Sequence, residues 1–409
     1  MRPVTVLALA FALLLPLSCS VRAAERVRLG IDVLLEPASP FAEALAGKRL
    51  GLITNPSGVD GALFPTADRL AMDARFRLVQ LYGPEHGIRG EAAAGDAVAD
   101  ELDPLTNLPV QSLYGARKAP SPDTLERLDV VVFDIQDIGS RTYTYVSTLG
   151  ETLKACAAAH KPLVVLDRPN PIGGTRFEGP LVREPYHSFI GWGPLPVTHG
   201  MTIGEVARLY NDVLEIGCEL TVVPLRGWKR DMVWEDTRLT WTTTSPHIPH
   251  ALQAHLYVTT GMVASSTTNV SDGVGTPMPF EALAAEFFDG NELADELDLL
   301  RLPGVRFQPT AFKPFYGKFN AKPLRGVRLV LDDPRVYRPL HTAVAVLVTL
   351  RKLYGERVGL ADELTIGKHW GNAELLGQLE RGATLAEIEA SWSADLARFE
   401  RSRAAALIY

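Results

Sequence analysis

The stretch Arg49–Thr54 reads RLGLIT, a short apolar run that is typical of a strand buried on both faces of a sheet. Four later runs of the same kind are Arg77–Leu81 (RLVQL), Asp129–Phe133 (DVVVF), Pro162–Leu166 (PLVVL) and Leu220–Leu225 (LTVVPL). Segments with helical spacing of apolar residues separate them, at Thr66–Ala74, Val146–His160 and Thr202–Leu214. Strands that alternate with helices predict an α/β fold with a mostly parallel sheet, covered on both faces.

A chain of 409 residues is too long for one ordinary core, so we expect two domains. The second, over 257–409, is predicted to be a smaller α+β domain that closes a cleft against 25–256. Its expected elements are a turn-rich stretch Ser265–Pro279, a helix Phe280–Phe288, a strand Val327–Leu331, a helix His341–Tyr354 and helices across the last forty residues. The segment Glu91–Pro122 has many turn residues, and we expect it to wrap the site rather than join the core.

Residues 1–24 are typical of a secretory signal peptide. Arg2 provides a positive start, Val4–Leu17 is apolar except for Thr5 and Pro16, and small residues follow up to Ala24. The apolar run is too short to span a membrane comfortably, so we expect an exported protein, periplasmic or secreted, without stable membrane insertion. A lipidated Cys19 is the alternative, and its flanking residues favour it less.

The net charge of -7 argues against nucleic acid or an anionic membrane surface as a non-specific partner. The chain contains no phosphate-binding or dinucleotide-binding glycine motif, so no cofactor is predicted. Cys156 and Cys218 could pair in an oxidising compartment, but both fall in predicted helix or at a helix end. We therefore expect two separate buried thiols.

Polar side chains follow four successive predicted strands, and the carboxyl ends of parallel strands share one edge of a sheet. The segments are Asn55–Gly58, Tyr82–Gly90, Asp134–Arg141 with Tyr143 and Tyr145, and Asp167–Gly174. One such loop would read as a polar turn, whereas four in series predict a site.

Glu85 is the best candidate for acid–base chemistry, because Gly83 and Pro84 lift it from a strand end beside His86. Asp134 and Asp137 offer a second carboxylate. The structural alternatives are a Glu85 ion pair with Arg89 or Arg141, and an Asp167–Arg168 ion pair. His247, His250 and His255 match no zinc pattern, so no metal is predicted. The glycine-rich loop Thr268–Thr276 could reach over a ligand, or could simply cap a helix.

Several long motifs together resemble the exo-β-N-acetylmuramidase family, long catalogued as a domain of unknown function. They are Gly83–Gly90 (GPEHGIRG), Leu108–Gly115 (LPVQSLYG), Phe133–Gly139 (FDIQDIG), Leu166–Pro171 (LDRPNP), Thr198–Thr202 (THGMT) and Asn269–Thr276 (NVSDGVGT). The resemblance covers essentially the whole mature chain. It implies a Rossmann-like N-terminal domain, a smaller C-terminal domain, a cleft between them, and hydrolysis of terminal N-acetylmuramic acid from the non-reducing end of peptidoglycan fragments.

The resemblance implies that Glu85 is the catalytic carboxylate. Our own candidates for its partner are Asp137, Asp134 and Asp272. Retention and inversion both stay open, because they depend on the separation of the two carboxyl groups. The substrate also carries a lactyl carboxylate, for which Arg89, Arg141 and Arg168 are candidates. The expected substrate-binding residues are Asn55, Tyr82, His86, Arg89, Gln136, Arg141, Tyr143, Asp167, Arg168, Asn170, His199, Asn269, Ser271 and Asp272.

The chain departs from the family pattern at Val274, where relatives often carry Arg. Two other classes of protein remain open. One is an exported protein that binds a cell-wall fragment without hydrolysing it. The other is an exported esterase or amidase that uses Ser57 or Ser140 as its nucleophile.

Overall fold

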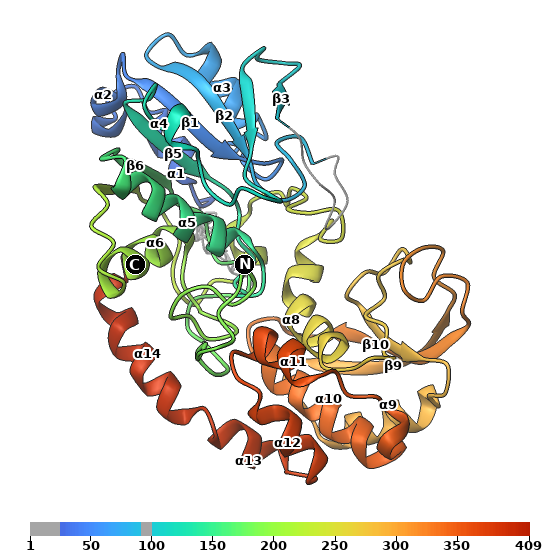
Figure 1. Ribbon diagram of the computed structural model, residues 1–409. Helices are drawn as coiled ribbons and strands as arrows, with labels where there is room; N and C mark the ends of the chain where they lie inside the picture. The colour runs from blue at the N-terminus through green and yellow to red at the C-terminus, as the bar shows by residue number, and fades with distance from the viewer. Residues whose placement is uncertain (1–24, 91–99) are drawn as a thin grey trace, which may run out of the picture.

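The computed structural model describes residues 25–90 and 100–409, which leaves the predicted signal peptide outside the described residues. Seven strands form one sheet in the order β3-β4-β2-β1-β5-β6-β7 (Figure 1). Its predicted strands are β1 (Arg49–Thr54), β2 (Arg77–Gly83), β5 (Val130–Asp134), β6 (Leu163–Leu166) and β7 (Leu220–Val223). Every neighbouring pair among them is parallel. The predicted α/β fold is therefore confirmed.

Both faces of this sheet are buried, because alternate residues of each strand enter different cores. Val131 and Phe133 of β5 pack on one side with α5 (Tyr145–Ala158) and α6 (Ile203–Val213). Val130 and Val132 pack on the other side with α1 (Gly30–Leu34), α2 (Pro40–Leu45) and α3 (Thr66–Met72). Burial on both sides explains why the strands read as continuous apolar runs.

The expectation for Glu91–Pro122 was wrong in part. Residues 91–99 lie outside the described residues, but β4 (Pro109–Ser112) pairs in parallel with β2, and β3 (Glu101–Leu102) pairs antiparallel with β4. Val110 is buried in the core. Without β4, the backbone N–H and C=O groups on one edge of β2 would lack hydrogen-bond partners. The four residues of β4 supply these partners, and Val110 points into the core. The short helix α4 (Pro122–Leu125) follows.

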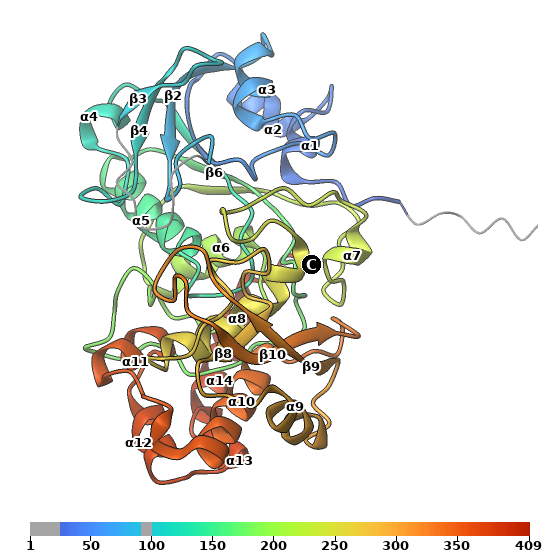
Figure 2. The same cartoon turned by 90° about the vertical axis from the view of Figure 1, so that its right-hand side faces the viewer.

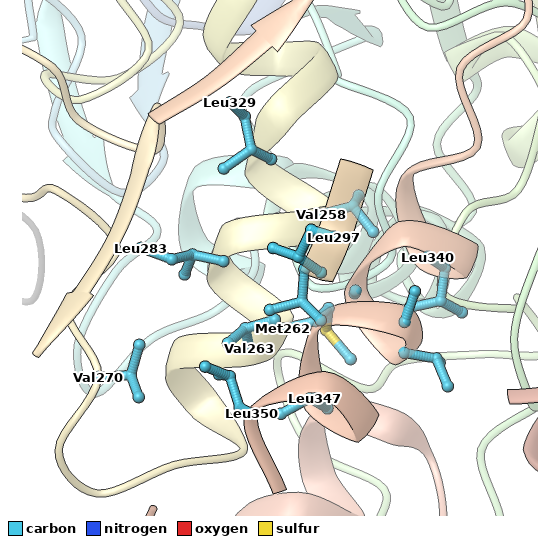
Figure 3. Close-up of a cluster of buried hydrophobic side chains, with 14 of the residues drawn as sticks. Val258, Met262, Val263, Val270, Leu283, Leu297, Leu329, Leu340, Leu347 and Leu350 are labelled. Carbon is cyan, nitrogen blue, oxygen red and sulfur yellow. The ribbon is translucent and has the colours of Figure 1, made fainter. Parts of the chain in front are cut away.

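The second region has a three-stranded antiparallel sheet in the order β8-β10-β9, with β8 (Ala282–Ala285), β9 (Val305–Phe312) and β10 (Leu324–Leu331). Figure 3 shows its core, in which Val258, Leu283, Leu297 and Leu347 gather between the sheet and the helices. The helices are α8 (Ala251–Ser265), α9 (Gly290–Leu299), α10 (Pro339–Tyr354), α11 (Glu363–Trp370), α12 (Glu374–Glu380), α13 (Leu385–Ala390) and α14 (Ser393–Ala406), with a 3-10 turn η1 (Gly355–Arg357).

The helix predicted over Phe280–Phe288 was wrong, because this segment contains strand β8. Its alanines, leucine and glutamates favour a helix locally. However, Ala282–Ala285 pair with Arg325–Arg328 of β10, and all four residues of β8 are buried. Pairing with β10 and burial thus override the local helix preference.

The last helix, α14, returns to the first domain and packs on α6 (Figures 1 and 2). Beyond it, the Tyr409 hydroxyl donates a 2.7 Å hydrogen bond to Asp167 Oδ2. The predicted domain boundary at 256 lies inside α8, which begins at Ala251. The short helix α7 (Trp234–Thr237) is the preceding helix in the chain. Across the described parts of the chain, no helix has the length and apolar character that a membrane crossing needs.

Cys156 lies on α5 and Cys218 precedes β7, and both are buried free thiols, as expected. Burial raises the pKa of Cys218 to about 11 and that of Cys156 further still. Neither thiol is therefore a reactive thiolate at neutral pH.

Candidate functional site

The loop that follows β2 brings Glu85 to the carboxyl edge of the sheet. His86 has a φ of 74°, in the left-handed region, and Gly87 follows at 79°. This sharp turn presents Glu85 to a cavity of about 180 Å³. The cavity is lined by Glu85, His86, Thr142, Tyr143, Thr144, Tyr145, Ser245, His247, Ile248, Tyr257 and Phe280. It lies where the first domain meets the second, because Tyr257 and Phe280 belong to the second region.

Glu85 is partly buried and held in place by neighbours from other segments. Thr144 Oγ1 donates a 2.8 Å hydrogen bond to Glu85 Oε2. Burial, a hydrogen bond to Glu85 and the charge of Glu85 raise the pKa of Tyr114 to about 12, so this phenol stays protonated at neutral pH. The Glu85 carboxylate therefore faces two hydroxyl groups. It has no ion pair with Arg89 or Arg141, the structural alternative considered from the sequence, among the described side chains.

Aromatic side chains form one wall of the cavity. The rings of Tyr143 and Tyr145 meet edge to face with their centroids 4.8 Å apart, and Tyr143 and Tyr257 meet similarly at 5.7 Å. Tyr257 in turn contacts Phe280 at 4.9 Å. The Tyr143 hydroxyl donates to Thr244 Oγ1 at 2.8 Å. These rings present faces and edges of the kind that sugar rings pack against.

Three carboxylates act on the same tyrosine. Burial, together with the charges of Glu85, Asp272 and Asp137, raises the pKa of Tyr257 to about 12, although a hydrogen bond with Thr142 acts in the opposite direction. Asp137 is 5% exposed and Oδ2 accepts hydrogen bonds from the Gly139 amide at 2.6 Å and His199 Nε2 at 3.1 Å. Its Oδ1 is buried without a hydrogen-bond partner among the described residues. His199 is oriented by the Met201 amide, which donates to its Nδ1 at 3.3 Å.

Asp134 and Arg168 form a buried ion pair away from the cavity lining, at 2.6 and 2.9 Å. Thr66 Oγ1 donates to the same carboxylate at 2.5 Å. Asp167 is fully buried and accepts from the Thr202 hydroxyl and the Gly204 amide, both at 2.8 Å. Both aspartates thus join the strand ends of the sheet to neighbouring helices.

The other two candidate arginines are also engaged. Arg89 donates to both oxygens of Asp103, at 2.7 and 2.8 Å, and to Asp68 at 3.0 Å. Arg141 is fully buried and donates to the carbonyls of Pro180 and Leu195, each at 2.9 Å, and of His369 at 2.7 Å. Burial lowers the pKa of Arg141 to about 10. These contacts anchor loops of the two domains.

The amide side chains predicted for binding lie outside the cavity lining and connect loops of the chain. Asn55 Nδ2 donates to the Thr244 carbonyl at 3.3 Å, and Gln136 Nε2 donates to the Pro169 carbonyl at 2.7 Å. Asn170 Nδ2 donates to the Met201 carbonyl at 3.0 Å. The Tyr82 side chain is fully buried, and its hydroxyl donates to Thr124 Oγ1 at 2.9 Å.

The two ends of the loop Thr268–Thr276 have different surroundings. Asn269 lies apart from the cavity lining, where its side chain holds the Arg357 carbonyl at 2.7 Å. Ser271 Oγ accepts from the Gly273 amide at 3.2 Å, and Asp272 Oδ1 accepts from the Val274 amide at 3.2 Å. Burial raises the pKa of Asp272. This loop therefore brings one carboxylate toward Tyr257.

The sequence interpretation missed Thr144 and Tyr257, and it considered His247 only as a metal ligand. His247 lines the cavity, and its Nε2 lies 2.7 Å from the Tyr316 hydroxyl of the second domain. Thr144 lies between Tyr143 and Tyr145 in the sequence, so these two tyrosines could have indicated that Thr144 also belongs to the site. No local signal marks Tyr257, because its role depends on the meeting of the domains.

His255 lies 3.3 Å from Glu235, away from His247. Within 25–90 and 100–409, no cluster of three or more metal-binding side chains occurs.

In the described part of the chain, the hydroxyl groups of the two candidate serine nucleophiles are hydrogen-bonded to groups other than histidine. Ser57 Oγ donates to Asn55 Oδ1 at 2.5 Å and accepts from the Gln136 amide at 3.0 Å. Ser140 Oγ contacts Thr142 Oγ1 at 3.0 Å. Neither arrangement resembles a nucleophile with its base.

A larger groove of about 880 Å³ lies beside α1 and α3, but its arginines are largely engaged by its own carboxylates. Asp60 pairs with Arg69 at 2.5 Å, and Asp73 pairs with Arg75 at 2.6 Å. The smaller cavity at Glu85 is the better candidate site, because it combines a carboxylate, imidazoles and aromatic walls.

Comparisons with known proteins agree over both domains. Residues 50–252 match the family model described as exo-β-N-acetylmuramidase NamZ, N-terminal, and residues 255–409 match the corresponding C-terminal model. The chain is 40% identical over 384 residues to the peptidoglycan β-N-acetylmuramidase NamZ of Bacillus subtilis strain 168, covering 94% of this chain and 92% of that protein.

Two solved structures from Bacteroides fragilis NCTC 9343, both described as DUF1343 family proteins, have the same fold. One is 38% identical with a TM-score of 0.86, and the other is 25% identical with a TM-score of 0.72. Each comparison covers 94% of this chain and 99% of the solved chain. The chain therefore belongs to the exo-β-N-acetylmuramidase NamZ family, a family of glycoside hydrolases.

Proposed function

We propose that this chain releases terminal β-linked N-acetylmuramic acid from the non-reducing end of peptidoglycan fragments. One observation carries the proposal. Glu85 reaches a cavity walled by Tyr143, Tyr145 and Tyr257, and Thr144 orients its carboxyl group at 2.8 Å. A positioned carboxyl group beside aromatic walls is what the hydrolysis of a glycosidic bond requires.

In the proposed reaction, Glu85 donates a proton to the glycosidic oxygen as the bond from that oxygen to the anomeric carbon breaks. Water then supplies a hydroxyl group to the anomeric carbon and returns a proton to the site. We propose Asp137 as the second carboxylate, because its Oδ1 is buried and unpartnered among the described residues, while His199 and Gly139 hold Oδ2. Both oxygens of Asp134 are occupied by Arg168, so Asp134 is not part of the proposed mechanism.

The small cavity supports exo action. At about 180 Å³ it is smaller than typical ligand sites, which span about 300–1,000 Å³. A small, walled cavity favours one terminal sugar over the interior of a polymer.

The decisive experiment compares the mature protein with its Glu85→Gln variant on a chromogenic β-N-acetylmuramide and on the matching N-acetylglucosaminide. We expect release from the muramide alone, and its loss in the variant. No release from either substrate, combined with tight muramide binding measured by calorimetry, would instead identify a binding protein. Near-normal turnover by Glu85→Gln would contradict the assigned acid.

We also propose that the protein is exported by way of residues 1–24. Mass spectrometry of the protein from the extracellular or periplasmic fraction tests this. We expect a mature N-terminus near Ala23 or Ala24. An acylated Cys19 would identify a lipoprotein instead, and an uncleaved chain confined to the cytoplasm would contradict export.

A further inference from the structure

The substrate of the proposed reaction carries a lactyl carboxylate, and the structure leaves the predicted arginines poorly suited to it. Arg168 is paired with Asp134, Arg89 with Asp103 and Asp68, and Arg141 with three carbonyl groups. Taking any of them for the substrate would break contacts that join loops or domains, which is unfavourable because it leaves buried partner groups unpaired. Another cation near Glu85 is therefore better placed for this role.

Lys118 has the environment that this role requires. Its Nζ lies 4.2 Å from the centroid of the Tyr114 ring and 4.3 Å from that of the Phe189 ring. The side chain is partly buried and forms no ion pair with a carboxylate of 25–90 or 100–409. Ser147 Oγ fixes the second ring by donating a 2.6 Å hydrogen bond to the Phe189 carbonyl. Two aromatic rings thus hold the ammonium group and leave its anionic partner to come from outside.

Lys118 is also linked to the proposed catalytic acid. Tyr114 contacts Lys118 through its ring and Glu85 through its hydroxyl. Burial lowers the pKa of Lys118, and the negative charge of Glu85 partly offsets this effect. One tyrosine therefore separates the cation from the acid. In muramic acid, one sugar ring separates the lactyl group from the glycosidic oxygen.

Other lysines near the cleft are less suited. Lys322 is half exposed and pairs with Glu286 at 2.9 Å. Lys318 lies 5.5 Å from the centroid of the Phe319 ring, and its charge acts on Asp272. Lys161 is not near the cleft, because it donates at 2.8 Å to the Leu128 carbonyl, just before the start of β5.

We propose that Lys118, held between Tyr114 and Phe189, binds the lactyl carboxylate of a terminal N-acetylmuramic acid, an inference that rests on the proposed function. A partly desolvated ammonium group interacts more strongly with a carboxylate than a fully hydrated one does. Lys118 would thereby distinguish muramic acid from glucosamine, which lacks the lactyl group.

The test is a binding measurement that needs no turnover. Calorimetry would measure the affinity of the mature protein for N-acetylmuramic acid and for its methyl ester, which is uncharged. We expect Lys118→Met to weaken binding of the acid more than tenfold and binding of the ester less than twofold. Lys118→Arg should restore most of the preference for the acid.

Lys154→Met is the matched control, because Lys154 also lies over an aromatic ring, 4.6 Å from the Trp192 centroid, but is exposed and already pairs with Glu151 at 3.8 Å. We expect it to change neither affinity. Equal losses of acid and ester binding in Lys118→Met would overturn the inference, as would a selective loss in Lys318→Met instead. If acid binding depends on Lys118 while no sugar is released, the inference stands and the proposed reaction fails.

Discussion

Thr144 Oγ1 and Glu85 Oε2 lie 2.8 Å apart, although 59 residues separate them in the chain. Glu85 follows β2, whereas Thr144 directly precedes α5. The sheet brings these two strand-end loops together, and the hydrogen bond then fixes the orientation of the carboxyl group. This contact is the most direct link between the fold and the proposed reaction.

Thr144→Val should remove this donor while preserving the size of the side chain. A hydrogen bond between uncharged groups, such as this hydroxyl and a protonated Glu85, contributes about 0.5–1.5 kcal/mol, so we expect kcat/KM to fall roughly twofold to tenfold. Thr148→Val is the control, because the Thr148 hydroxyl contacts only the Thr144 carbonyl, at 3.2 Å, one turn along α5. Unchanged kinetics in Thr144→Val, measured on the chromogenic muramide, would show that the contact does not orient the acid.

Asp137→Asn tests the second carboxylate. General acid–base groups contribute about 10²–10⁴-fold to rates, and we expect a loss in kcat within this range. Asp272→Asn should cost less, because the proposed mechanism assigns Asp272 no proton transfer and its side chain holds its own loop through the Val274 amide. Steady-state kinetics of both variants decide between them. A larger loss in Asp272→Asn would transfer the proposed role from Asp137 to Asp272.

The Asp103–Arg89 contact predicts a pH-dependent contribution to stability. Burial would raise the pKa of Asp103, but hydrogen bonds from Arg89 and Thr106 outweigh burial and lower it to about 2, below its ordinary value of 3.8. A lowered folded-state pKa stabilises the protein above the unfolded-state pKa, and this contribution is lost as the pH falls toward 2. Its size at neutral pH is about 2 kcal/mol.

Asp103→Asn should therefore lower the free energy of unfolding at pH 7 and have a smaller effect at pH 3. Urea denaturation at the two pH values measures the difference. The exposed Asp295 of α9 provides the control, since Asp295→Asn should change stability little at either pH. An Asp103→Asn effect that is the same at both pH values would rule out the ionic contribution.

Tyr316→Phe removes the hydroxyl group that contacts His247 Nε2 across the domain boundary at 2.7 Å. Tyr316 is 42% exposed, so the melting temperature should hardly change. We expect a several-fold rise in KM for the muramide, because a neutral hydrogen bond contributes about 1 kcal/mol. Tyr186→Phe is the control, since its hydroxyl contacts Glu363 away from the cavity lining. A KM equal to that of the control would show that the contact between Tyr316 and His247 does not contribute to substrate binding.

The fold of the first domain was largely predictable, because each central strand is a continuous apolar run and polar residues follow it. Two elements were not. Ala282–Ala285 prefers a helix locally and becomes strand β8 through pairing with β10. Pro109–Ser112 looks like a turn-rich insert and becomes strand β4 through the free edge of β2.

The sequence predicts which loops carry the polar residues of the candidate site. It does not predict which of those residues contact one another. Glu85 and Asp137 stand out in the sequence as carboxylates after buried strands. The sequence offered Arg89, Arg141 and Arg168 equally as cations for a substrate, and the structure places all three in contacts within the protein.

By itself, the sequence determined the parallel sheet, the edge at which polar loops gather and the family to which the chain belongs. The sheet and its polar edge depend on local patterns of apolar and polar residues along each strand. The family is indicated by long motifs such as Gly83–Gly90, which resemble those of its members. Only the tertiary structure decided which polar groups face the cavity and which pair with one another. Thr144, Tyr257 and Lys118 acquire their places from segments distant in sequence, because electrostatic and hydrogen-bond partners are set by proximity in space.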